Sequence, residues 1–286
     1  MISAAELTSL AATHDIISLG MLADDQRRAR HGAKTTFVRV AKTASDPGAP
    51  VVRPAAAGEL RIDGVPTSRA AAVERVLEVA AAAAGAAVTG FSLADLELLA
   101  AREGATLRAL LEELRAAGLE LVAEAPMDLL RDPRRSIEEV NIAGLPLARL
   151  TVDKLPSADP MPLLRAVADL QRAVAVIRAF APLPRRVNPV APTTGFEDVK
   201  HVALARLVVE NVASIQVDWA LYGPKLAQVA LTVGADDVDS VSADAETTEG
   251  RRRAPLEEIR RNIIAAGQEP VERNGRFELR GEGHRL

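Results

Sequence analysis

The chain has 286 residues, which is enough for one large domain or two ordinary ones. Hydrophobic residues make up 48% of it, but aromatic residues only 2%, so we expect a folded core built mainly from aliphatic side chains. A net charge of −4 argues against nucleic acid as a partner. No apolar run approaches the ~18 residues of a membrane-spanning helix. We therefore expect a cytoplasmic protein without a membrane partner.

The chain contains no cysteine. This excludes disulfides, zinc–thiolate sites, thiol nucleophiles and any iron–sulfur cluster held by thiolates of this chain. The four histidines are His14, His31, His201 and His284, and none belongs to an HxH or HExxH motif. The sequence therefore predicts no metal site.

Apolar periodicity and turn residues predict alternating strands and helices. Strands are expected at 34–40, 59–63, 86–92, 119–123, 148–152, 174–181 and 215–219. Helices are expected within 3–31 (two helices) and at 68–84, 93–103, 106–117, 133–143, 160–173, 195–211, 223–231 and 256–266. Strands separated by such helices are typical of βαβ units and a parallel sheet. The length fits a (β/α) barrel as well as a doubly wound sheet.

Local signals set several element boundaries. Ser3 and Glu6 have the spacing of a capping box for the first helix, and Gly32 is a typical stop for the second. Three prolines within 41–58 exclude a regular helix there, so this segment is predicted to be irregular.

Three features allow more than one interpretation. Residues 234–240 (GADDVDS) place three carboxylates together; they form either a cation or polar-substrate site or, as we favour, the N-cap of a following turn. The run GRRRAP at 250–255 is interpreted as a solvated loop. Trp219 and Tyr222 follow a predicted strand, where they would either stack on a substrate or anchor the core.

The C-terminal third carries a family pattern. Residues 192–211 (PTTGFEDVKHVALARLVVEN), 215–239 (IQVDWALYGPKLAQVALTVGADDVD) and 263–273 (IIAAGQEPVER) resemble the C-terminal region of the menaquinone-pathway radical SAM enzymes. These are aminofutalosine synthase and cyclic dehypoxanthinylfutalosine synthase, with the FO synthase subunits of the F420 pathway as cousins. Residues 19–40 and 179–184 resemble the segment leading into the family's first strand and its sixth strand.

The resemblance implies a (β/α) barrel of radical SAM type that is partial or lacks its first barrel helix. It divides the chain into an N-terminal helical segment (1–34), a degenerate barrel (35–240) and a C-terminal extension packed on the barrel (241–286). Five residues match the family's C-terminal motif and are expected to line a substrate cavity: Trp219, Lys225, Gln228, Asp236 and Asp237.

The pattern fails where the family's chemistry takes place. The family holds a [4Fe-4S] cluster by a CxxxCxxC motif after the first strand, and the cluster binds and cleaves S-adenosylmethionine. The corresponding residues 41–60 are cysteine-free and shortened, and the family's glycine-rich turn is represented only by DGVP at 63–66. Asp95 and Asp128 lie where the family carries glutamates, and RRVNP (185–189) replaces its histidine, glutamate and asparagine segment. We expect neither cluster nor cofactor, so the chain is not a radical SAM enzyme by itself.

Three functions remain open. The first, which we favour, is a non-radical pseudoenzyme or partner subunit of a cluster-bearing paralogue in menaquinone biosynthesis, since loss of a barrel helix would expose strand edge and apolar surface to a partner. The second is a cluster-independent enzyme acting on a nucleoside or chorismate-derived carboxylic acid. The third is a protein that binds such an intermediate without converting it.

Overall fold

The computed structural model describes residues 4–157, 159–190, 192–246 and 253–280. Nine strands form one sheet, at β1 Lys34–Ala44, β2 Glu59–Asp63, β3 Ala87–Ser92, β4 Leu121–Pro126, β5 Leu147–Val152, β6 Ile177–Pro184, β7 Ser214–Asp218, β8 Asp237–Ser242 and β9 Glu269–Arg273. Eight of them close into a parallel barrel, because the order β2 to β8 continues to β1 and β1 pairs again with β2. The barrel rather than the doubly wound sheet is therefore confirmed.

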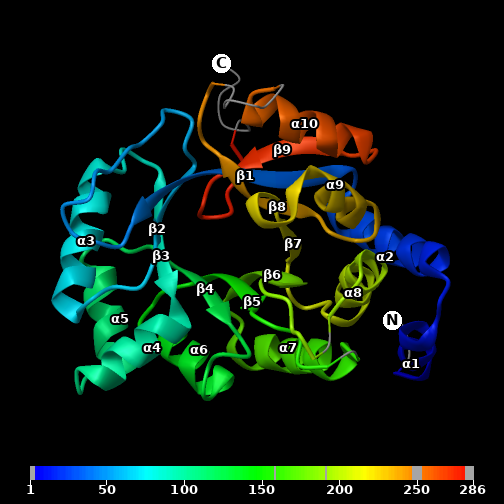
Figure 1. Ribbon diagram of the computed structural model, residues 1–286, viewed down its shortest axis with the longest axis horizontal. Helices are drawn as coiled ribbons and strands as arrows, with labels where there is room; N and C mark the ends of the chain where they lie inside the picture. The colour runs from blue at the N-terminus through cyan, green and yellow to red at the C-terminus, as the bar shows by residue number, and fades with distance from the viewer. Residues whose placement is uncertain (1–3, 158, 191, 247–252, 281–286) are drawn as a thin grey trace.

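Helices surround the barrel (Figure 1). They are α1 Ala4–Ala12, α2 Ile16–His31, α3 Arg69–Ala82, α4 Leu93–Arg102, α5 Leu107–Ala116, α6 Pro133–Ile142, α7 Met161–Val174, α8 Gly195–Val208, α9 Trp219–Thr232 and α10 Pro255–Ala265. Residues 45–58 connect β1 to β2 without a helix, as the sequence predicted. Within the described ranges, no helix has the length and apolar character needed to cross a membrane.

The long first strand organises both ends of the barrel. Its second half pairs with β2 from Val40 onward, and its first half pairs on the same side with β9. β8 covers the opposite side of β1. Omission of the first barrel helix therefore leaves no open edge on β1, which corrects the expectation of an exposed strand edge.

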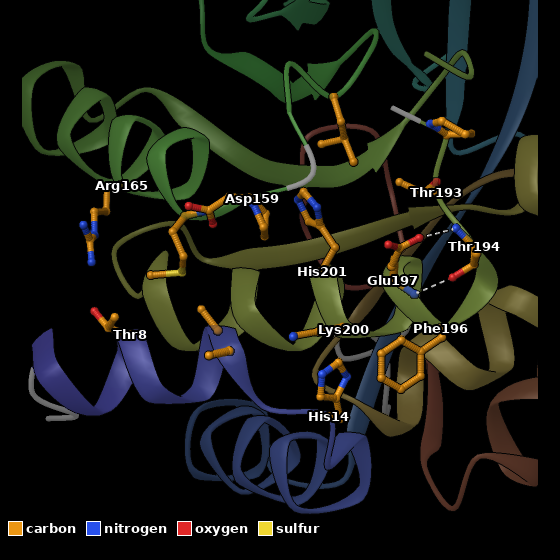
Figure 2. A pocket seen from close by; sticks show the side chains of 16 residues that line it. Thr8, His14, Asp159, Arg165, Thr193, Thr194, Phe196, Glu197, Lys200 and His201 are labelled. Carbon is orange, nitrogen blue, oxygen red and sulfur yellow. Dashed lines mark hydrogen bonds between the residues drawn. The ribbon is translucent and has the colours of Figure 1, made fainter. Parts of the chain in front are cut away.

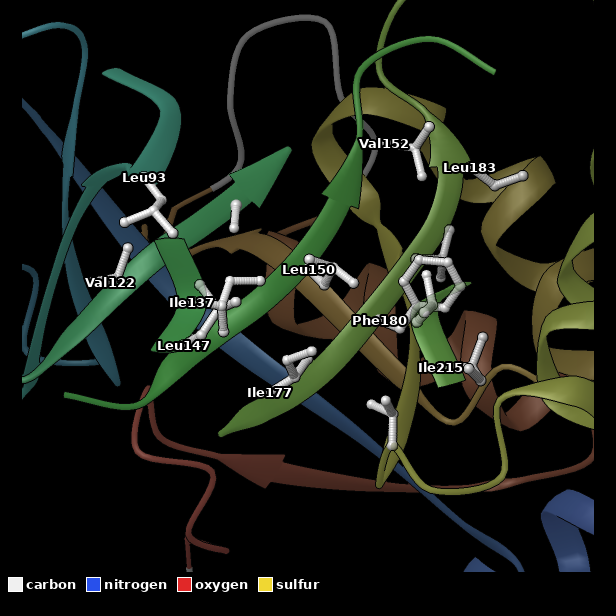
Figure 3. Close-up of a cluster of buried hydrophobic side chains, with 14 of the residues drawn as sticks. Leu93, Val122, Ile137, Leu147, Leu150, Val152, Ile177, Phe180, Leu183 and Ile215 are labelled. Atoms are coloured by element: carbon white, nitrogen blue, oxygen red, sulfur yellow. The ribbon is translucent and has the colours of Figure 1, made fainter. Parts of the chain in front are cut away.

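The apolar core lies between the strands and the helices. Figure 3 shows its part over β4 to β7, where Leu150, Phe180 and Ile215 come from three successive strands and Ile137 comes from α6. All four side chains are fully buried. Leucine, valine and alanine fill most of this layer, as the composition predicted.

Two segments differ from the sequence-based elements. Residues 234–240 were interpreted as a capped turn, but Asp237 begins strand β8. Aspartate has a low strand propensity, so three carboxylates do not predict a strand. The segment nevertheless forms one because it pairs with β1 on one side and with β7 on the other. Strand β9 was not predicted, since it is a short polar sequence that depends on the same partner. Ser3 and the first half of the 250–255 run lie outside the described residues.

Candidate functional site

A small charged cavity of 150 Å³ opens at the carboxyl ends of the strands. This is the end at which (β/α) barrels place their active sites. Residues from the ends of β1 to β7, or just beyond them, line it: Lys42, Arg61, Ile62, Asp63, Gly64, Val65, Phe91, Ser92, Asp95, Ala123, Glu124, Arg149, Arg185 and Asp218. We call this cavity the mouth site.

An ion-pair cluster forms the floor of the mouth site. Arg61 on β2 donates two hydrogen bonds to the Asp239 carboxylate on β8, at 2.8 and 3.0 Å. Arg149 on β5 donates to the same carboxylate from across the barrel. Burial acts to raise the pKa of Asp239, but the Arg149 and Arg61 guanidinium groups hold that pKa well below its ordinary value. Asp239 is therefore a fixed negative charge.

The charge of Arg61 is fixed by the same contacts. Its Nε donates to Glu59 at 2.7 Å, and Glu59 also accepts a hydrogen bond from Thr89 at 2.6 Å. Burial acts to lower the pKa of Arg61, but Asp239 and Glu59 raise that pKa well above its ordinary value. The guanidinium group stays protonated at the floor of the cavity.

The wall of the mouth site carries a second set of charges. Arg185, just after β6, contacts Glu124 on β4 at 2.7 Å and approaches Asp218 on β7 at 3.8 Å. Nε of Arg185 and Nε of Arg149 are buried and have no hydrogen-bond partner among the described residues. A buried donor without a hydrogen bond is costly. Arg149 Nε lies 3.5 Å from the Glu124 carboxylate as an ion pair, so Arg185 Nε is the more poorly satisfied of the two donors.

Asp95, in the first turn of α4, supplies a group that can exchange a proton. Burial, with a smaller effect from the nearby Glu124 carboxylate, raises its pKa above the ordinary aspartate value. On the neighbouring strands, Lys42 of β1 contacts Asp63 of β2 at 3.2 Å. Burial acts to raise the pKa of Asp63, but the Lys42 ammonium lowers it overall. The site thus holds one carboxyl suited to acid–base work beside several fixed charges.

A second hollow of 370 Å³ lies beside the mouth site, over the ends of β1 and β8. Lys42 lines both cavities. Val52 and Pro54 from the β1–β2 connection form part of its wall. The connection that replaces the first barrel helix therefore shapes the space above the barrel.

The β1–β2 connection does not fit an iron–sulfur cluster. Arg75 of α3 holds it in place by donating hydrogen bonds to the carbonyl oxygens of Ala44 at 2.7 Å and Ala49 at 2.8 Å. Its neighbour Glu78 accepts from the Gly48 N–H at 2.9 Å. No thiolate is present, and no group of three potential metal ligands exists in the described ranges. An iron–sulfur cluster is held by thiolates, so these residues do not fit one.

The five residues expected to line a substrate cavity do not come together. Trp219 begins α9 and is buried in the apolar core with 8% exposure, whereas Lys225 on the same helix is exposed. Gln228 is half-buried near Asn262 of α10. Asp236 and Asp237 lie at the amino end of β8, opposite to the mouth site. Their assignment to substrate binding stays a prediction.

Contacts around the two aspartates are structural in character. Asp237 accepts two hydrogen bonds from Arg273 at 2.7 Å, and further ones from Thr36 and Gln216. Asp236 pairs with Arg206 and accepts from the Ile215 N–H. These bonds join β9 and α8 to the lower end of the barrel, the end whose residues usually serve stability.

The two unusual aromatic residues act as core anchors. Trp219 belongs to the buried apolar cluster, and Tyr222 packs against that cluster. The Tyr222 hydroxyl donates to the carbonyl oxygen of Pro184 at 2.8 Å. Burial raises the pKa of Tyr222. Of the two interpretations left open by the sequence, this arrangement favours anchoring over stacking on a substrate.

The sequence analysis missed the main charged residues of the mouth site. Arg61, Arg149 and Asp239 each stand at the third position of their strands and have an apolar or β-branched residue among their immediate neighbours. Alternation places such a residue on the face opposite to its apolar neighbours. In a barrel, the face opposite to the helix-packed apolar residues is the interior. Charged residues within the predicted strands were therefore the sequence signal for this site.

The fold and the site define a class, a parallel (β/α) barrel with a charged cavity at the carboxyl ends of its strands. Methylornithine synthase (PylB) superimposes with a TM-score of 0.68 and 12% identity, covering 94% of both chains. The hydrogenase maturase HydG from Carboxydothermus hydrogenoformans gives 0.63 and 10%, covering 94% of this chain and 75% of that one. These likenesses concern the fold.

Sequence comparisons place the chain more closely. Residues 181–285 match the CofH/MqnC C-terminal region family. Aminodeoxyfutalosine synthase of Streptomyces coelicolor is 37% identical over 30% of this chain and 24% of its own length. Cyclic dehypoxanthine futalosine synthase of the same organism is 28% identical over 59% and 48%. A 5-amino-6-(D-ribitylamino)uracil–L-tyrosine 4-hydroxyphenyl transferase of Methanosphaerula palustris is 28% identical over 53% and 48%.

The chain contains no cysteine, its residues 181–285 match the CofH/MqnC C-terminal region, and parts of it are similar to aminodeoxyfutalosine synthase and cyclic dehypoxanthine futalosine synthase. The matched segments span less than half the length of each of these three curated relatives.

Proposed function

We propose that the chain is a non-radical pseudoenzyme of the futalosine-synthase type, and that its mouth site binds a small carboxylic acid related to that pathway. One observation carries the proposal. At the strand ends, Arg149 and Arg185 each have a buried Nε–H that makes no hydrogen bond among the described residues, although Arg149 Nε lies 3.5 Å from the Glu124 carboxylate. A guanidinium group pairs with carboxylate through adjacent N–H donors, so an incoming carboxylate satisfies both atoms.

Size and charge support a small acid. A cavity of 150 Å³ admits a carboxylate and part of a ring, and the adjoining hollow above β1 and β8 gives room for the remainder. Lys42, between the two spaces, adds a further positive charge. Asp95 lines the same cavity, and burial raises the pKa of its carboxyl, which eases the approach of an anion.

Calorimetry with benzoate and its neutral isostere benzamide tests this proposal, followed by 3-enolpyruvylbenzoate as the pathway-type acid. We expect benzoate to bind and benzamide to bind at least about tenfold more weakly, because only the carboxylate accepts charged hydrogen bonds. Arg185→Gln should reduce benzoate affinity by a similar factor. Arg172→Gln is the matched control, because Arg172 pairs only at the surface of α7 with Asp169. Equal affinity for the two compounds refutes the proposal.

The non-radical character has a separate test. Anaerobic reconstitution with iron and sulfide should give no cluster absorption, because the chain supplies no thiolate. A reductively cleavable S-adenosylmethionine complex formed by the purified chain alone would contradict this part of the proposal.

A partner-subunit function rests on a different observation. Ile17 and Met21 lie one turn apart on α2 and are 73% and 64% exposed. Such apolar side chains on a free helix face suit contact with another protein, here a cluster-bearing paralogue. Co-expression should yield a complex that Ile17→Lys weakens. If no complex forms and the paralogue's activity is unchanged, the partner function is refuted.

A further inference from the structure

A cavity of 710 Å³ lies on the outside of the barrel, separate from the mouth site (Figure 2). Helix α1 closes one side, the beginnings of α7 and α8 form the other, and segments following β5 and β6 complete the wall. The cavity shares no lining residue with the mouth site. Its volume is typical of sites for small organic ligands, which range from ~300 to 1,000 Å³.

His201 is the unexplained group in this cavity. Its side chain belongs to α8, is only 3% exposed, and lines the cavity wall. Nε2 is buried and has no hydrogen-bond partner among the described residues. Burial lowers the pKa of His201 to about 4, so the ring is neutral near neutral pH. A neutral imidazole carries one donor and one acceptor nitrogen, and Nε2 is the acceptor in the tautomer whose proton is on Nδ1. A buried polar atom without a partner is destabilising unless a ligand satisfies it.

Two carboxylates and one ammonium group at the cavity differ in their hydrogen bonds. The carboxylates of Asp159 and Glu197 are occupied by the backbone N–H groups of Met161 at 3.0 Å and Thr194 at 2.7 Å. Lys200 donates to the carbonyl oxygen of Thr13 at 2.8 Å and retains further protons on its ammonium. Each carboxylate therefore accepts a backbone N–H at the start of α7 or α8, and the Lys200 ammonium keeps N–H donors for a further acceptor.

The rest of the wall is largely apolar. Ala11, Leu155, Met161 and Pro192 contribute aliphatic surface, and Phe196 lies beside His14 at the edge in Figure 2. Arg165 is exposed on the first turns of α7 and adds a second cation. An apolar wall with one buried acceptor and cations at its rim matches a flat ring that carries a donor and an acidic tail.

We propose that this cavity is a second ligand site that binds a planar aromatic carboxylate, with a ring N–H or O–H donating to Nε2 of His201 and the carboxylate directed to Lys200 and Arg165. The site is independent of carboxylic acid binding at the barrel mouth. α1 is part of its wall, so an occupied site ties the N-terminal helix to α7 and α8.

Two probes that differ by one donor test the proposal on the full chain. Indole-3-acetate has a ring N–H and a carboxylate, and 1-methylindole-3-acetate lacks only the N–H. Calorimetry should show about five- to tenfold weaker binding of the methylated probe, the effect of one hydrogen bond. His201→Leu, which keeps an apolar side chain at this position, should remove the difference between the probes.

Controls separate this site from the mouth site. Arg185→Gln should leave indole-3-acetate affinity unchanged, since Arg185 lines only the mouth. Should His201→Leu fail to fold, the ring-nitrogen NMR signal of His201 in the unmodified chain decides, and it should shift with indole-3-acetate. Equal affinity for the two probes, an unshifted His201 signal, or loss of binding in Arg185→Gln each overturns the proposal.

Discussion

The buried histidine of α8 makes the stability of the protein depend on pH in a way that can be isolated. His201 has a pKa of about 4 in the folded chain, lowered by burial from an ordinary value of 6.5. The unfolded chain therefore binds more protons between these values. For a histidine with a lowered pKa, stability is full above the unfolded pKa and is lost as the pH falls toward the folded pKa.

The size of the effect follows from the two pKa values. Proton linkage from about pH 7.5 to about pH 5 gives a loss of about 2 kcal/mol from this one ring. His201→Leu removes the titrating group while keeping an apolar side chain in the site. The variant should therefore lose about 2 kcal/mol less than the unmodified protein over the same interval, whatever its stability at pH 7.5.

Urea unfolding followed by tryptophan fluorescence measures this difference, because Trp219 is the single tryptophan and is buried. His14→Leu is the control: it also replaces a histidine at the same cavity, but one whose side chain is exposed. It should preserve the pH dependence of the unmodified chain. If His201→Leu retains that dependence in full, His201 is not held neutral by burial and the reasoning fails.

Three further changes test the packing around the sites by urea unfolding. Asp239→Asn should cost about 3–5 kcal/mol, because it leaves two buried guanidinium groups without their shared charge, whereas Asp169→Asn in an exposed pair should cost under about 1 kcal/mol. Thr194→Ala removes the α8 capping box and should cost about 1 kcal/mol, and no loss would contradict the cap. Gly118→Ala should lower the free energy of unfolding more than Gly104→Ala does. Both glycines have positive φ, but only at Gly118 would a Cβ lie 2.8 Å from another atom, the Cβ of Ala80. Equal losses would show that the contact with Ala80 is relieved.

Elements with strong local signals were predictable from the sequence. Strand 59–63 and the helix at 133–143 were placed within a residue or so of their observed ends, because alternation and an N-terminal proline set them locally. Strands β8 and β9 were not, since their polar sequences become strands only through pairing with β1. That pairing is a long-range contact, which no local pattern encodes.

In the candidate sites, too, some features were predictable from the sequence and others depend on long-range contacts. The missing cluster ligands followed directly from the absence of cysteine. RRVNP was noted only as a departure from the family pattern, and the structure places its first residue, Arg185, at the mouth. Asp239 was hidden within an acidic run whose role as a strand was unknown. His201 carried no sequence signal, because its neutrality comes from three elements far apart in the chain that together bury it.

The interior of the barrel gives the strongest reason to regard the mouth as a binding site. A barrel of this kind normally fills its lumen with layers of branched apolar side chains. Here Glu59, Arg61, Arg149 and Asp239 occupy it as buried ion pairs. Buried ion pairs often contribute no more stability than apolar residues of the same volume would, because desolvation offsets their attraction. Stability alone therefore does not account for them. The guanidinium groups face a small cavity, and the Nε–H groups of Arg149 and Arg185 make no hydrogen bond among the described residues. An anionic ligand accounts for this arrangement.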